Sequence, residues 1–215
     1  MTPVNALLRV LGIGLLGSLA ARLPVRVATW VQFALIVIGS LLPLWPLFEG
    51  WVHLQDLLAY SALWLALSVV GTLIRLSTMQ RRNDATRFLW LHYTIMIGAL
   101  SLVTGVWSII LLSMAGPSGG WIALIPTAVA LVLANAWSLA DGWFRRGGSR
   151  VAKVWQVVLP GYLRFVPVLL GTIAGAVLII GDSPAQQQLM AAAALILVLA
   201  TVDITLAALS LRLIA

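Results

Sequence analysis

Seven polar or ionisable side chains lie within or at the ends of long apolar stretches of this 215-residue sequence. A carboxylate or guanidinium among aliphatic residues costs free energy unless it is paired, so such residues are functional candidates by default. Histidines and acids can transfer protons or hold ions, and amides can hydrogen-bond between helices. The candidates are Asp203, Arg164, Asn135, Asp141, His92, His53 and Asp56.

The composition excludes a soluble globular protein. The chain is 62% hydrophobic and 9% charged, whereas soluble proteins are about 25% charged. Apolar segments of about 20 residues, enough to cross a bilayer, recur along the chain. We therefore predict an all-α, polytopic transmembrane helical bundle. Its spans are 27–48, 54–78, 88–114, 121–144, 154–180 and 188–211, and residues 27–215 form one membrane domain without a soluble domain.

The basic residues predict the orientation in the membrane. Eleven of the thirteen Lys and Arg residues lie at alternate ends of the spans: Arg22, Arg26, Arg75, Arg81, Arg82, Arg87, Arg145, Arg146, Arg150, Lys153 and Arg212. The other three joints contain no basic residue but hold Glu49 and Asp182. This is the positive-inside pattern. It predicts a bacterial inner-membrane protein with a cytoplasmic C-terminus, and it accounts for the net charge of +7 by contact with the lipid bilayer rather than with nucleic acid.

Tryptophan is abundant near the predicted span ends. Indole combines an apolar ring with a polar N–H and favours the membrane interface. We therefore expect an aromatic belt formed by Trp30, Trp45, Trp51, Trp90, Trp121, Trp143 and Trp155.

The first 26 residues form a separate hydrophobic segment with three interpretations. Its apolar run from Val10 to Ala21 is short for a crossing. It could be a signal peptide, a seventh span, or an interfacial or re-entrant helix on the cytoplasmic side; the last keeps Arg9 with the other basic residues. Gly12, Gly14 and Gly17 match the spacing of a dinucleotide fingerprint. That fingerprint requires a preceding strand, so we interpret these glycines as packing positions.

Arg164 and Asp203 are predicted to form an ion pair. Arg164 lies ten residues into its span and Asp203 nine residues before Arg212, which places both about 13–15 Å from the cytoplasmic end. Small residues share their faces, including Gly171 and Gly175, whose spacing permits close helix approach. In the alternative, Pro160 begins the span and Arg164 snorkels to the interface.

The other candidates have weaker signals. Asp141 is expected to pair with Arg145 one turn later, and Asn135 to hydrogen-bond between helices. His92 adds to the polarity of the cytoplasmic half, whereas His53 and Asp56 lie at the outer side. Because the two histidines are predicted at opposite faces, they cannot ligate one haem iron. We predict no cofactor, no metal site and no catalytic set; the chain has no cysteine.

Two functions fit these features. The first is a small transporter or channel that uses the polar cluster in the cytoplasmic half of the bundle. The alternative is a non-catalytic structural or assembly subunit of a larger membrane complex, with membrane-protein partners or further copies of the chain. A membrane-embedded enzyme ranks third, because no catalytic constellation is evident.

Overall fold

The computed structural model describes residues 13–80, 84–116 and 120–212, and within these ranges every regular element is a helix. Six helical segments are long and apolar enough to cross a membrane, which confirms the predicted all-α bundle. The elements are α2 (Ile13–Arg22), α3 (Val25–Leu41), α4 (Leu44–Phe48), α5 (Leu54–Thr78), α6 (Asp84–Tyr93), η1 (Thr94–Gly98), α7 (Ala99–Ala115), α8 (Trp121–Trp137), η2 (Ser138–Arg145), α9 (Gly148–Val151), α10 (Val154–Ile180) and α11 (Ala185–Arg212).

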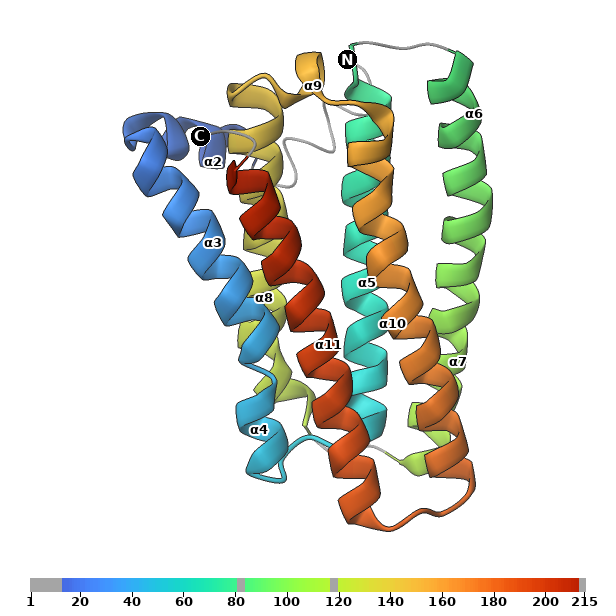
Figure 1. Ribbon diagram of the computed structural model, residues 1–215. Coiled ribbons are helices and arrows are strands. Elements are labelled where there is room, and N and C mark those ends of the chain that lie inside the picture. The colour runs from blue at the N-terminus through green and yellow to red at the C-terminus, as the bar shows by residue number, and fades with distance from the viewer. Residues whose placement is uncertain (1–12, 81–83, 117–119, 213–215) are drawn as a thin grey trace.

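Successive spans run in opposite directions, so alternate joints gather at the same end of the bundle (Figure 1). Helix α9 and the ends of α5, η2 and α11 lie at one end, and α4 lies at the other (Figure 1). Arg145, Arg146 and Arg150 belong to the first of these ends. We call it the basic end.

Helix α5 occupies the centre of the bundle. It has the largest buried share of the six spans, and it packs most extensively on α10 and α7. Helix α3 packs most extensively on α8 and α11. The bundle therefore consists of two groups of helices, α3–α8–α11 and α5–α7–α10, which meet mainly where α10 lies against α11.

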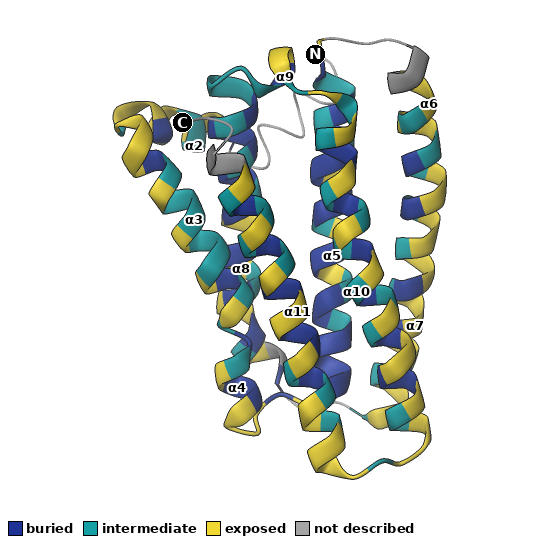
Figure 2. Cartoon of the chain, viewed as in Figure 1, coloured by how far each residue is buried: buried dark blue, intermediate teal, exposed yellow. Residues whose placement is uncertain are grey.

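Large apolar side chains cover the outside of the bundle. Leu102, Val103, Ile122 and Val177 are each more than 60% exposed, and exposed residues recur along every outer helix (Figure 2). A soluble monomer rarely exposes so much continuous apolar surface. These faces are the ones expected to contact lipid.

The close approach predicted for α10 and α11 is present at only one of its two glycines. A Cβ atom on Gly171 would lie 2.6 Å from Cδ1 of Leu195 in α11, so the two helices are as close as glycine allows. A Cβ on Gly175 would instead meet Leu58 of α5 at 2.6 Å. The two glycines therefore face different neighbours of α10.

The main described element of the N-terminal segment is α2, which is ten residues long. At about 1.5 Å per residue this helix is about 15 Å long, half of a bilayer core. It packs against η2 at the basic end and against α8. Residues 1–12, with Arg9 and Gly12, lie outside the described residues, so the interfacial placement of the segment stays a prediction.

Candidate functional site

The predicted pair between α10 and α11 is present in the structure. Nε of Arg164 donates to Oδ1 of Asp203 at 2.7 Å. Asp203 is 4% exposed. Helix α10 continues through Pro160 from Val154, so the alternative in which the span begins at Pro160 is wrong. A paired carboxylate and guanidinium can persist in an apolar interior because each offsets the charge of the other.

Two other helices hold the pair in place. From α5, Ser68 accepts a hydrogen bond from Nη1 of Arg164 at 3.1 Å, and Trp64 places its ring 5.8 Å from the guanidinium carbon. From α3, the hydroxyl of Ser40 donates to Oδ2 of Asp203 at 3.5 Å. The pair thus connects both groups of helices.

A cavity of about 230 Å³ extends from the ion pair towards the basic end. A water molecule needs about 10–15 Å³ of such space, so the cavity has room for a small solute and several waters. Six helical segments contribute to its wall. The polar lining residues are Gln32, Arg75, Asn135, Ser138, Gln156, Arg164 and Asp203.

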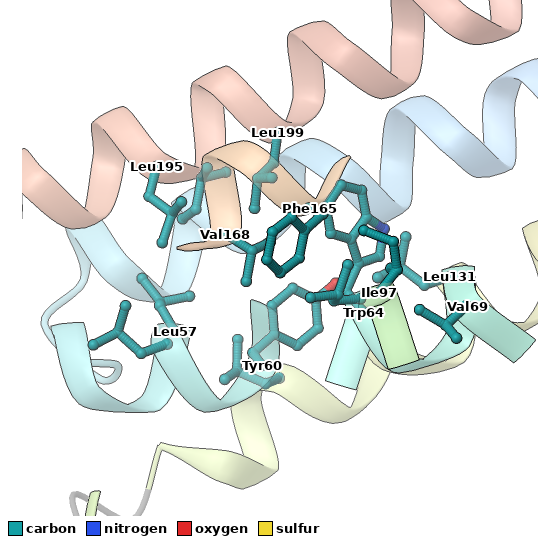
Figure 3. Close-up of a cluster of buried hydrophobic side chains, with 14 of the residues drawn as sticks. Leu57, Tyr60, Trp64, Val69, Ile97, Leu131, Phe165, Val168, Leu195 and Leu199 are labelled. Carbon is teal, nitrogen blue, oxygen red and sulfur yellow. The ribbon is translucent and has the colours of Figure 1, made fainter. Parts of the chain in front are cut away.

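A second, much smaller cavity of about 20 Å³ touches Ser40, Tyr60 and Trp64. Because Ser40 and Trp64 also contact the ion pair, the pair lies between the two cavities. Next to the pair, apolar side chains of α5, η1, α8, α10 and α11 form a buried cluster (Figure 3). They are Leu57, Tyr60, Trp64, Ile97, Leu131, Phe165, Val168, Leu195 and Leu199, which we call the apolar cluster.

Arg75 is a wall residue that sequence reasoning did not include among the candidates. Its Nη2 donates to Oγ of Ser138 at 2.9 Å, which connects the end of α5 to the start of η2. The positive-inside pattern predicts Arg75 at a cytoplasmic joint. Arg75 nevertheless falls inside the predicted span 54–78. This position within a span was the signal that could have marked it as a candidate site residue.

The π-helical segment η2, which the sequence did not predict, positions Ser138 and Trp143 in the cavity wall. Insertions of this kind are frequent at functional sites. Trp143 was expected in an aromatic belt, but it is buried and its Nε1 donates to Oγ1 of Thr78 at 2.8 Å. Gln80 also donates its backbone N–H to the carbonyl of Ser149 at 2.9 Å. These bonds fasten η2 and α9 to the end of α5.

Asn135 and Asp141 lie close in sequence but have different roles. Asn135 lines the cavity, and its amide nitrogen donates to the carbonyl of Leu131 in its own helix at 3.0 Å, not to another helix as predicted. Asp141 is fully buried and accepts from Nε of Arg145 at 2.6 Å, as predicted, and also from Arg146, which was not predicted. It is not part of the cavity wall.

The histidines and Asp56 lie away from the cavity. His92 stacks on Phe88 with ring centroids 5.9 Å apart and lies 6.4 Å from the ring of Tyr162. Asp56 is buried near the opposite end, where its Oδ2 accepts the backbone N–H of His53 at 2.9 Å. This contact satisfies a free N–H at the start of α5, which is a structural role.

The cavity therefore joins three of the seven candidates, Arg164, Asp203 and Asn135, and leaves four outside. The residues that sequence reasoning missed in the wall are Arg75, Ser138, Gln32 and Gln156. Ser138, Gln32 and Gln156 are uncharged, and Arg75 was predicted at a cytoplasmic joint. The geometry is that of a chamber lined by polar and apolar side chains, with the ion pair in its wall.

Comparison with known proteins identifies a family but no function. No curated protein and no solved structure matches the chain. A family model described as "Family of unknown function (DUF6498)" matches residues 22–213. That match includes all the spans and every residue of the cavity wall. The chain therefore belongs to this family of unknown function, DUF6498.

Proposed function

We propose that this membrane protein is a small transporter or channel in which a solute enters the cavity from the basic end and reaches the Arg164–Asp203 pair. The observation that carries the proposal is the cavity of about 230 Å³ whose wall includes Arg164 and the buried Asp203. A protein that only scaffolds a complex has no need to place polar side chains around such a chamber within the membrane.

The distribution of polar and apolar side chains supports passage rather than simple packing. The cavity wall combines seven polar side chains with apolar ones, and the apolar cluster lies next to the pair. In many transporters one bundle of helices moves against another around a central site. Here Arg164 belongs to α5–α7–α10, and Asp203 belongs to α3–α8–α11, so the pair joins two groups whose relative movement would open the site. In this proposal the basic end faces the cytoplasm of a bacterial inner membrane.

The absence of native cysteine gives a direct test of access to the cavity. In Ala134→Cys the single thiol would line the cavity, whereas in Ala192→Cys it would lie among buried apolar side chains. We expect a membrane-impermeant thiosulfonate reagent to modify the first variant and to leave the second unmodified. Reaction in inverted vesicles, but not in right-side-out vesicles, would confirm that the basic end is cytoplasmic. No reaction of Ala134→Cys from either side, in a protein that reacts fully once denatured, would contradict the access route.

Transport itself is tested in proteoliposomes with a panel of monovalent cations, halides, carboxylates, phosphate and protons, with empty liposomes as the control. We expect flux of at least one class above the control. Flux of none, together with recovery of a stoichiometric membrane-protein partner in mild detergent, would replace the proposal with the assembly-subunit function. A single homo-oligomeric species with flux would support transport by several copies.

A further inference from the structure

We infer that the cavity binds a small oxyanion, a carboxylate or a phosphate, and that Arg75 is its principal ligand. The inference deepens the proposed function by naming the ligand class, and its biological meaning rests on that function. It starts from the charges that face the cavity: the two guanidinium groups of Arg75 and Arg164 and the carboxylate of Asp203.

These charges do not balance. Asp203 is committed to Arg164 and Ser40. Asp141, the acid of η2, is committed to Arg145 and Arg146. Arg75 makes no ion pair within the part of the chain that the structure describes, and its hydrogen bond goes to a neutral hydroxyl, that of Ser138. One positive charge therefore faces the cavity without a protein carboxylate to offset it.

An unbalanced guanidinium within a membrane domain is costly, and an anion that enters the cavity would lower that cost. Arginine is suited to oxyanions because its planar fork can donate two parallel hydrogen bonds to a carboxylate or phosphate. Ser138 accepts one N–H of Nη2, so the other N–H of Nη2 remains to form such a fork together with Nη1 or Nε of Arg75.

Neutral polar groups complete the site. Gln32, Asn135 and Gln156 line the same cavity from α3, α8 and α10. The amide oxygen of Gln156 accepts the backbone N–H of Lys153 at 2.8 Å, which leaves its amide nitrogen as a donor. Donors of this kind fix the orientation of a small ligand. The volume of about 230 Å³ is ample for an ion of the size of phosphate or acetate with some of its water.

The test is a binding titration of the purified full-length protein in neutral detergent, after removal of bound lipid. The probes are inorganic phosphate and acetate. We expect saturable binding of phosphate or acetate to the wild type. We expect Arg75→Gln to weaken binding by about tenfold or more, because hydrogen bonds to a charged group are lost. Arg150→Gln, which removes a positive charge from α9 outside the cavity wall, should leave affinity unchanged.

The substitution Arg75→Lys keeps the charge but removes the planar fork, so weaker oxyanion binding by this variant supports the assignment even if Arg75→Gln does not fold. A further titration with phosphatidylglycerol in the same detergent tests the source of the ligand. Saturation by the lipid, lost in Arg75→Lys, would assign the site to a lipid phosphate. Equal binding to wild type and both Arg75 variants, or no binding of any probe, would overturn the inference.

Failure of this inference and failure of the proposed function give different results. Oxyanion binding that depends on Arg75 in a protein without flux would support the site and contradict transport. Flux of a cation or proton with no oxyanion binding would support transport and contradict the site.

Discussion

Replacing Asp203 with asparagine is expected to reduce flux in proteoliposomes to the level of empty liposomes while the helical bundle stays folded. Asparagine has nearly the same shape as aspartate but lacks its charge, so Arg164 would face the cavity without a counter-ion. The loss of a hydrogen bond to a charged group also costs about 1.5–3 kcal/mol of folding stability. The measurements are solute flux and the thermal unfolding midpoint in detergent. Asp182→Asn, which neutralises an exposed acid in the loop before α11, is the matched control and should change neither.

A double variant distinguishes a role of the Arg164–Asp203 pair in transport from a role that only holds α10 against α11. Removing only one partner of a buried pair leaves an uncompensated charge, whereas removing both is often nearly neutral for stability. We therefore expect Arg164→Gln/Asp203→Asn to regain most of the stability lost in the single variant but to remain inactive. If the double variant transports normally, the pair serves only to hold α10 against α11. Unchanged flux in Asp203→Asn alone would exclude a role for this carboxylate in transport.

Gly161→Ala is expected to give the largest loss of stability among the glycine variants. A Cβ atom at this position would lie 2.8 Å from two ring carbons of Tyr93 and would also overlap its hydroxyl. Tyr93 is fully buried and packs edge-to-face on Tyr162 with centroids 5.7 Å apart, so its ring has little room to move. Overpacking a close-packed site costs about 1–3 kcal/mol. The measurement is the unfolding midpoint in detergent, with the fraction of monodisperse protein.

Two further variants make this prediction specific. Gly105→Ala on α7 has no atom within 4 Å of the added Cβ. It should be neutral, or stabilising by about 0.5–1 kcal/mol, because alanine favours a helix over glycine. In a Tyr93→Leu background, which removes the hydroxyl and the end of the ring, Gly161→Ala should cost much less than in the wild type. Equal costs in both backgrounds would show that Tyr93 is not what excludes a side chain at residue 161.

The sequence determined the membrane class and the depth of its polar groups. The predicted bounds of α5 and α10, 54–78 and 154–180, agree with the structure, because the length of an apolar run and a rise of about 1.5 Å per residue fix where a span begins and ends. The same rise placed Arg164 and Asp203 at one depth, and they are in contact. Asp141 and Arg145 could be paired for a similar reason, since residues four apart lie on one helix face.

Lateral arrangement was decided only by the tertiary structure. A span that is apolar on every side has no amphipathic pattern that reveals its neighbours, so nothing in the sequence indicated that α5 is central or that Arg75 faces the same cavity as Asp203. Which helices become neighbours depends on close packing, such as Gly171 against Leu195 and Gly175 against Leu58. It also depends on the π-helical turn at η2, which places Ser138 within reach of Arg75. Apolar length sets depth within a membrane, but the fit of side chains between helices sets which polar groups meet.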